Sequence, residues 1–480
     1  MGLKAKWSAF TESNRAIGGA TLLPIRLTLI YLVVSLLMYE FGVFDWITYK
    51  PILFYGLMVS YLTALWAGYR VGIRRQFPKA IEWKSSIIDR CIPALTVLLV
   101  LGYILYVVNV FRSYGLKTFD FPELFSRMAV GITNPGLGYA MNRERIMTLD
   151  ASMIMGGTVV TLINYVWSFL RYPVLLFSML YFKKLPIVGK IVMIFYLITM
   201  VLYYLSIGTT IDILTVFLWI ELPVILRAFT AAHEKKLDKK QVLRLLAGLL
   251  AGIIFIACYF GWMMLSRGGI NNYDQPEYNV GGVHLSEGTV STPSDGDEGD
   301  SSHSINKYIP PIVMKVWISA TSYLTQGYYG MSQALTLPWQ PMYGVGNSMF
   351  LVDFISGNFC DVDQYTYQVR MEPLGWDSDI QWHSMYTWLA NDVSFFGVIL
   401  VMLLIGLLFG AMFRDAITTE NPFAKISVFY FILMMLFIPC NNQIAQKADT
   451  LFSFVLVVLC WLISKYPPKF IRNRLNKQEA

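Results

Sequence analysis

Arginines are the residues of this chain whose type and setting most directly suggest chemistry. Arg267 lies in Leu-Ser-Arg-Gly-Gly at the end of an apolar run, Arg370 lies among acidic neighbours, and Arg143 follows Asn-Pro-Gly-Leu-Gly-Tyr. A guanidinium is a planar fork that binds phosphate through two parallel hydrogen bonds. The glycine pair after Arg267 would let a ligand approach the backbone closely. These residues predict an anion-binding site, and a snorkelling or solvated arginine is the alternative at each position.

The stretch QWHSMYTWLANDVSFFG, residues 381–397, precedes one of the longest apolar runs and contains His383. An imidazole with an ordinary pKa of about 6.5 can orient a hydroxyl or bind a diphosphate, and an interfacial histidine satisfied by water is the alternative. If this stretch were one helix, roughly 100° per residue would place His383 and Asp392 on opposite faces, with Asn391 nearer to His383. Asp392 is then predicted to be the N-cap of the following helix.

The composition predicts how these residues are positioned. Hydrophobic residues make up 56% of the 480 residues and charged residues only 14%, whereas soluble domains carry about 25% charge. The excess apolar surface must face lipid, and several continuous apolar runs approach the roughly 20 residues that cross a bilayer as a helix. Because these runs do not alternate as barrel strands do, the sequence predicts an all-α, polytopic integral membrane protein with about ten transmembrane helices.

Apolar run length places the predicted spans near residues 22–44, 51–69, 91–111, 160–182, 188–206, 211–228, 246–265, 392–413, 426–440 and 450–466. The first seven spans, within residues 1–265, form a membrane bundle that includes an outer loop at 112–150. The last three spans and a basic tail occupy residues 392–480. The fourth span carries Arg171 and Pro173, and a charge at that depth should face a protein or water-filled interior unless it lies at the cytoplasmic edge.

Residues 266–391 are predicted to form one large extracytoplasmic loop. Its part at about 286–303 is rich in Gly, Ser, Asp and Glu, cannot bury a core, and is predicted to be disordered. Its part at about 308–337 is apolar and aromatic but broken by prolines and glycines. That pattern predicts helices lying along, or dipping into, the outer membrane interface.

The basic residues predict orientation. The formal net charge of +7 is not read as nucleic-acid binding, because in membrane proteins Lys and Arg mostly mark cytoplasmic loops. With the N-terminus inside, the cytoplasmic pieces hold about 24 Lys and Arg and the much longer outer pieces about 11. Both termini are therefore predicted to be cytoplasmic. The sequence contains no HExxH, P-loop, GxSxG or Cys/His metal motif, so neither a metal nor a cofactor is expected.

Three segments resemble the Wzy-type oligosaccharide repeat-unit (O-antigen) polymerases. They are SYLTQGYYGMSQAL, YGVGNSMFL and WHSMYTWLANDVSFFGVIL, in the family's order of a Tyr/Gly-rich segment, a Gly-x-Gly turn and an aromatic-polar lead into a late span. The best resemblance covers about residues 323–400, and GTTIDIL at 208–214 and SRGG at 266–269 also match family positions. Many members carry a basic residue in the first of these two stretches. This chain has none there, so another group would have to bind phosphate.

The resemblance implies an enzyme that joins undecaprenyl-diphosphate-linked oligosaccharides into O-antigen or a similar polysaccharide on the outer face of the bacterial inner membrane. An O-antigen-ligase-like transferase using the same donor and a polysaccharide flippase are the alternatives, and the long outer loop argues against a transporter. A chain-length regulator is a candidate partner. Together with the arginine argument, the resemblance indicates His383 as the catalytic residue. The candidate substrate-binding residues are Arg267, Arg370, Arg143, Tyr328, Tyr329 and Asn391.

Overall fold

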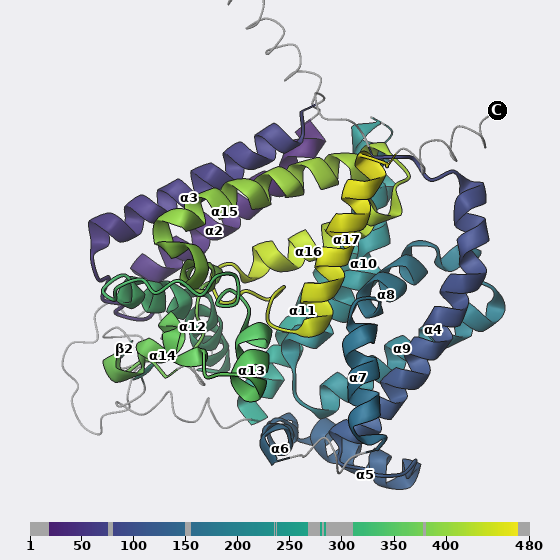
Figure 1. The fold of residues 1–480 in the computed structure, drawn as a ribbon, viewed down its shortest axis with the longest axis horizontal. Coiled ribbons are helices and arrows are strands. Elements are labelled where there is room, and N and C mark those ends of the chain that lie inside the picture. The colour runs from purple at the N-terminus through teal and green to yellow at the C-terminus, as the bar shows by residue number, and fades with distance from the viewer. Residues whose placement is uncertain are drawn as a thin grey trace, which may run out of the picture.

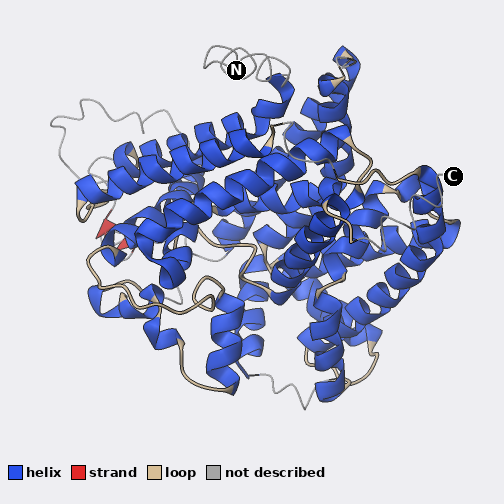
Figure 2. Cartoon of the chain, turned by 45° about the horizontal axis from the view of Figure 1, so that its top comes forward, coloured by secondary structure: helices blue, strands red, loops and turns tan. Residues whose placement is uncertain are grey.

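A computed structural model describes residues 19–74, 80–148, 155–234, 236, 238–266, 279–280, 283–284, 311–377 and 381–468. The fold is all-α, as predicted, and helices run through the whole described chain (Figure 2). The two short strands, β1 (Asn279–Val280) and β2 (Val283–His284), pair only with each other. The predicted disordered segment at 286–303 lies outside the described residues.

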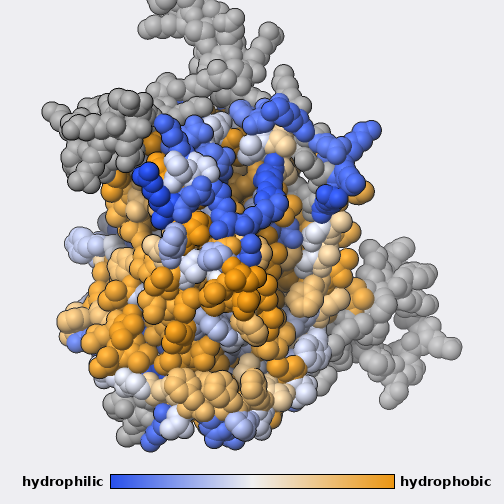
Figure 3. Space-filling model, turned by 90° about the vertical axis from the view of Figure 1, so that its right-hand side faces the viewer, coloured by the Kyte–Doolittle hydropathy of each residue, from blue (hydrophilic) through white to orange (hydrophobic). Residues whose placement is uncertain are grey.

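Eight described helices are long and apolar enough to cross a membrane. They are α2 (Gly19–Phe41), α3 (Pro51–Gly72), α4 (Ser85–Ser113), α9 (Ile187–Ser206), α10 (Thr210–His233), α11 (Lys239–Ser266), α15 (Met385–Thr418) and α17 (Ala448–Lys465). The chain is therefore a multi-pass membrane protein. Apolar residues cover the middle of the face shown in Figure 3, and hydrophilic residues gather at its top.

The two remaining predicted spans differ from simple membrane helices. The fourth consists of α7 (Gly157–Ser168) and α8 (Arg171–Leu180), which meet at an angle of 51°. Pro173 accounts for the break, because it has no N–H to donate to the carbonyl of Phe169 and is tolerated only near the start of a new helix. The ninth is α16 (Pro422–Phe437), whose 16 residues make it shorter than a full span.

Short helices cap one end of the bundle, here called the loop side (Figure 1). From the first outer loop come α5 (Phe121–Thr133) and α6 (Pro135–Thr148). From the large loop come α12 (Pro311–Ala334), α13 (Met349–Asn358) and α14 (Tyr367–Arg370) with the 3₁₀ turns η4 (Asp363–Tyr365) and η5 (Glu372–Leu374). The 3₁₀ turn η2 (Phe182–Lys184), at the opposite end, joins α8 to α9. Residues 311–377 and 381–384 are called the loop lobe. Its described apolar segment forms one helix, α12, whose second half is buried in the protein.

Helices α3 and α15 pack with their backbones in close approach (Figure 1). Each carries a Gly-x-x-x-Gly pair, Gly68 with Gly72 and Gly406 with Gly410. A Cβ atom at Gly68 would lie 2.0 Å from the carbonyl oxygen of Leu403, and one at Gly406 would lie 2.2 Å from that of Leu65. Small residues at this spacing let membrane helices associate through van der Waals contact, since lipid gives no hydrophobic driving force between helices.

A kink in α15 separates this packed part from its first turns. Ser394 has φ 61° and ψ 165°, a conformation that residues with a side chain rarely adopt. The Tyr61 hydroxyl of α3 donates a hydrogen bond of 2.6 Å to the carbonyl oxygen of Phe395, just after the kink. The kink directs the first turns of α15 toward the loop lobe.

We predict that Gly68→Ala destabilises the protein, because the added methyl group would collide with backbone on α15. The expected loss is about 1–3 kcal/mol of unfolding free energy, as for overpacked cores, seen as a lower Tm in detergent. Gly56→Ala on the same helix is the matched control, because a Cβ there meets nothing within 4 Å. Equal Tm values for the two variants would contradict the packing described.

Candidate functional site

His383 lies in the turn before α15 and is buried. Its side chain is enclosed by aromatic rings, with ring centroids 5.9 Å from Trp376 and 6.3 Å from Trp388. Neither ring nitrogen has a hydrogen-bond partner in the described part of the chain. Burial lowers the pKa of His383 to about 3. The imidazole is therefore neutral near pH 7, which leaves a lone pair for a hydroxyl proton but removes the charge that would attract a diphosphate.

Tyr328 and Tyr329 are both buried on α12. The Tyr328 hydroxyl lies 2.9 Å from the Ser35 hydroxyl of α2, and the Tyr329 hydroxyl accepts a hydrogen bond of 3.1 Å from Gln333. The Tyr329 ring also contacts Trp376, with ring centroids 5.4 Å apart. The structure thus brings Tyr329 and His383 to the same tryptophan, and it gives Tyr328 a packing contact between α12 and α2.

Asn391 uses its side chain to hold parts of the loop lobe together. Its Oδ1 accepts a hydrogen bond of 2.8 Å from the backbone N–H of Tyr367. Its Nδ2 donates to the carbonyl oxygen of Gly346 at 2.8 Å and to Oε1 of Gln368 at 2.9 Å. Both amide hydrogens therefore have protein partners, which supports a structural role for a residue that the sequence suggested as substrate-binding.

Asp392 anchors the Gly-x-Gly turn. Its carboxylate accepts hydrogen bonds from the backbone N–H groups of Gly344 at 2.7 Å, Gly346 at 3.0 Å and Asn347 at 2.9 Å. The predicted N-cap role of Asp392 is wrong, because α15 begins earlier and Ser384 is its N-cap. The three donors explain why a carboxylate stands here, since a charged acceptor can satisfy several backbone amides of a tight turn.

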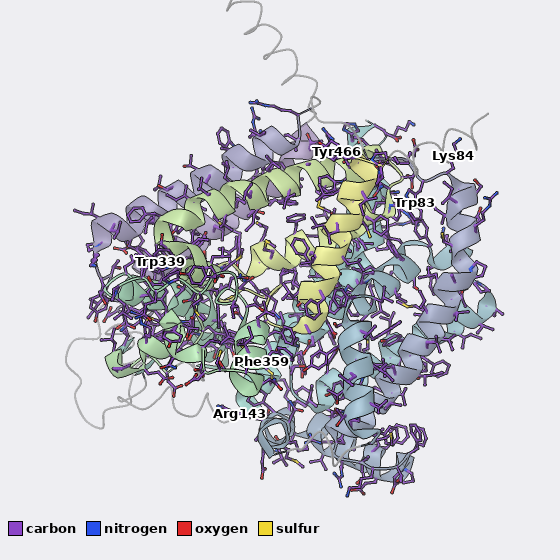
Figure 4. The ribbon with its side chains drawn as sticks, viewed as in Figure 1. Trp83, Lys84, Arg143, Trp339, Phe359 and Tyr466 are labelled. Atoms are coloured by element: carbon purple, nitrogen blue, oxygen red, sulfur yellow. The ribbon has the colours of Figure 1, made fainter. Side chains whose placement is uncertain are left out.

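The two candidate arginines that the structure describes, Arg370 and Arg143, do not form one site. Arg370 donates a hydrogen bond of 2.8 Å to the carbonyl oxygen of Pro338, and its guanidinium lies 5.5 Å from the ring centroid of Tyr367. Arg143 is exposed on α6, and in the view of Figure 4 it lies beside Phe359 at the edge of the loop lobe and away from Trp339. Arg267 lies outside the described residues.

Two ion pairs form a second polar cluster where four helices begin or break. The Nη1 atom of Arg171 donates to Oδ2 of Asp449, and Nζ of Lys447 lies 2.9 Å from Oδ1 of Asp212. Asp212 and Asp449 lie in the first turns of α10 and α17, where the helix dipole favours a negative charge. Arg171 is the first residue of α8, the helix that follows the break at Pro173, and this position lets its side chain meet Asp449.

Tyrosines surround Arg171. Its guanidinium lies 5.2 Å from the ring centroid of Tyr106, and the Tyr106 and Tyr196 rings lie 5.0 Å apart. The hydroxyls of Tyr106 and Tyr196 and the Nε atom of Arg171 are buried and lack a partner among the described residues. Arg171 and Asp212 both lie within electrostatic range of Tyr203 and Tyr204. The charge–tyrosine cluster comprises Arg171, Asp212, Lys447, Asp449, Tyr106, Tyr196, Tyr203 and Tyr204.

A further contact connects this cluster with the loop side. The guanidinium of Arg145 on α6 lies 4.4 Å from the ring centroid of Tyr114. The Tyr114 hydroxyl lies 2.5 Å from the Ser206 hydroxyl at the end of α9. Arg145 also lies within electrostatic range of Tyr203. A third cation is thus near the cluster, on the helix that carries the exposed Arg143.

The cluster is partly open, since the side chains of Arg171 and Asp449 are 22% and 23% exposed and that of Lys447 is 47% exposed. It joins cations, which can stabilise a phosphate leaving group, with carboxylates, which can take a proton from an attacking hydroxyl. Within the described residues, no group of three or more His, Cys, Asp or Glu side chains is arranged to hold a metal ion.

Sequence reasoning missed most of this cluster. Arg171 was signalled by its position in an apolar run, but Lys447 and Asp449 lie in an ordinary Lys-Ala-Asp helix start. Their partners are 235 and 278 residues away along the chain. One signal was available in the sequence. The stretch at 208–214 lacks the basic residue that many members of the resembling family carry there, and in the structure Lys447 supplies a positive charge beside Asp212 of that stretch.

We predict that buried His383 makes stability depend on pH. The unfolded chain takes up this proton near pH 6.5, while the folded chain takes it up only near pH 3. Protonation therefore favours unfolding between these values, and the folded state is destabilised as pH falls, by at most about 1.4 kcal/mol per pH unit. His383→Gln should lack this component in Tm measurements in detergent from about pH 7 to about pH 4. Parallel curves for the variant and the wild type would show that His383 is not buried in its neutral form.

No family model, curated protein or solved structure matches the chain. Function is therefore inferred below from the described side chains, from the membrane fold and from the chemistry that the two clusters allow.

Proposed function

We propose that this chain is a membrane glycosyltransferase that joins undecaprenyl-diphosphate-linked oligosaccharide repeat units on the outer face of the bacterial inner membrane. The observation that carries the proposal is the charge–tyrosine cluster, which holds two cations, two carboxylates and unpartnered tyrosine hydroxyls within a membrane bundle. A lipid-linked diphosphate sugar complements these groups. Its apolar tail suits a membrane bundle, its anionic leaving group suits the cations, and its hydroxyl groups suit the carboxylates and tyrosines. The segments that resemble repeat-unit polymerases support this reading.

The reaction makes two demands on the protein. The oxygen of an acceptor hydroxyl attacks the anomeric carbon of the donor, and the bond from that carbon to the diphosphate oxygen breaks. The electron pair leaves with undecaprenyl diphosphate, and the hydroxyl proton passes to a base. Arg171 offers the bidentate geometry for the departing diphosphate, and Lys447 adds a second positive charge.

The carboxylates of Asp212 and Asp449 are the proposed proton acceptors. Each stands beside a cation that a diphosphate would draw away, and a carboxylate freed from its ion pair becomes a better acceptor. His383, the residue that the sequence indicated as catalytic, is neutral and unpartnered, but a pKa of about 3 makes it a weak base. We therefore assign His383 to orienting an acceptor hydroxyl.

The proposed orientation places the loop side outside and both termini in the cytoplasm. Basic side chains at the opposite end of the bundle support it. They include Arg74, Lys84, Lys184, Arg227 and Lys425. The hydrophilic top of Figure 3 lies at the same end as the start of α2 and the end of α17 in Figure 1. A chain-length regulator would then meet the chain from the outer face or within the bilayer.

We predict that Arg171→Lys and Asp449→Asn each abolish polymer while the protein still accumulates. Lysine keeps the charge but loses the fork that binds two phosphate oxygens, and asparagine cannot take a proton. The measurement is the length of surface glycan on a gel, in the host strain with its own gene deleted and each variant restored. Asp89→Asn is the matched control, because the Asp89–Lys184 ion pair is exposed and lies away from the cluster.

The same gel separates the alternatives. Single capped repeats without a ladder indicate lost polymerisation, and lipid-linked polymer that never reaches the surface acceptor indicates a ligase. Lipid-linked single repeats held on the cytoplasmic side indicate a flippase and would contradict the proposal. A wild-type ladder from Arg171→Lys would remove Arg171 from the site.

A further inference from the structure

A cavity of about 530 Å³ lies between α8, α10 and α16, at the end of the bundle opposite the loop side. Its lining includes Tyr181, which follows α8, Arg227 and Thr230 of α10, and Lys425 of α16. The volume falls in the range of about 300–1,000 Å³ that is typical of ligand sites. The proposed reaction uses none of these residues, because the charge–tyrosine cluster lies at the other ends of α8 and α10.

The carboxylates of this cavity are paired, whereas one of its cations is not. Glu420 forms an ion pair with Lys425, and Glu234 lies 3.0 Å from Nζ of Lys236. Arg227 forms no hydrogen bond or ion pair with any described residue, so its guanidinium fork is available to a ligand. Because three cations and two carboxylates line the cavity, an anionic ligand would balance the excess positive charge.

Hydroxyl groups add hydrogen-bond donors to the same cavity. Thr230 lies three residues after Arg227, on the same face of α10. The Tyr181 hydroxyl is buried and has no hydrogen-bond partner among the described residues. A buried hydroxyl without a partner is costly, so a ligand that bonds to it gains affinity. An arginine fork and neighbouring hydroxyl donors are together suited to the oxygens of a phosphate group.

The apolar part of the lining indicates which phosphate compound fits. Leu180, Pro223 and Leu226 line the cavity beside the polar groups. A soluble phosphate ion would gain nothing from these side chains, whereas the glycerol and first acyl carbons of a phospholipid would be removed from water against them. The cavity also lies beside the last turns of α8 and α10, where apolar helices end and lipid headgroups begin.

We propose that this cavity binds the phosphate group of an anionic phospholipid from the leaflet at this end of the bundle. In the proposed orientation this is the cytoplasmic leaflet, whose anionic lipids are attracted by basic side chains. The site is separate from the charge–tyrosine cluster, and its occupation does not depend on the proposed transferase activity.

The test measures the Tm of the purified full-length protein in a nonionic detergent. The probes are phosphatidylglycerol, phosphatidylcholine with the same acyl chains, and sn-glycerol 3-phosphate. Phosphatidylglycerol should raise the Tm more than either of the others at equal concentration. Arg227→Gln, which removes the charged fork, should weaken the affinity for phosphatidylglycerol about tenfold, and Tyr181→Phe, which removes only the hydroxyl, should weaken it about threefold.

Arg90→Gln on α4 is the matched control, because it makes the same exchange at an exposed arginine that is near this end of the bundle and outside the cavity. It should keep wild-type affinity. Equal affinities of the wild type and Arg227→Gln would overturn the inference. Equal losses in Arg227→Gln and Arg90→Gln would also do so, because they would indicate nonspecific attraction of the lipid to basic side chains.

The soluble probe separates the two sources of phosphate. A rise in Tm with sn-glycerol 3-phosphate as large as that with phosphatidylglycerol would assign the cavity to a soluble phosphate compound and overturn its assignment to a lipid. A wild type that responds to none of the probes would remove the site altogether. The proposed transferase function would survive each of these results.

Discussion

Every backbone amide and carbonyl inside a membrane bundle needs a partner, and the non-helical connection between α16 and α17, residues 438–447, supplies only part of its own, such as the bond from Ala445 to Asn442. The surrounding protein satisfies other groups. Ser348 donates a hydrogen bond of 2.7 Å to the carbonyl oxygen of Ala445, and the carbonyl oxygen of Ile438 accepts from Met385. Gly327 allows α12 to approach, since a Cβ there would lie 2.1 Å from the carbonyl oxygen of Pro439. The loop lobe is thereby fixed to the bundle, and it cannot be displaced without exposing polar backbone.

The same requirement brings the charges together. The connection ends at Lys447, so the first turn of α17 lies beside the break that Pro173 makes between α7 and α8. Arg171 and Asp449 meet there, and a partly buried charge is tolerated because it is paired. Opening such a pair is unfavourable unless an incoming charge takes the vacated place. In the proposed function, an incoming diphosphate would take that place beside Arg171.

The sequence predicted the parts of the fold that depend on local composition, and it missed those that depend on distant contacts. Continuous apolar runs located the helices, and Arg171 was noticed because a charge in such a run needs an interior partner. The fourth and ninth predicted spans differ from the structure, because the helix breaks before Arg171 and because α16 is short. Hydropathy does not show where a helix ends. The role of Asp392 was misassigned because its partners lie in the turn at Gly344–Asn347, more than 40 residues earlier. Asp449 had no local signal at all.

The most direct test of the central claim is a reaction with purified components. The full-length protein in detergent or nanodiscs receives only the lipid-linked repeat unit, with no nucleotide sugar, and the products are separated by size while released undecaprenyl diphosphate is quantified. The proposed function predicts a ladder of lipid-linked oligomers, with one undecaprenyl diphosphate released for each bond formed. Unchanged substrate in the presence of folded protein, as judged by its Tm, would contradict it.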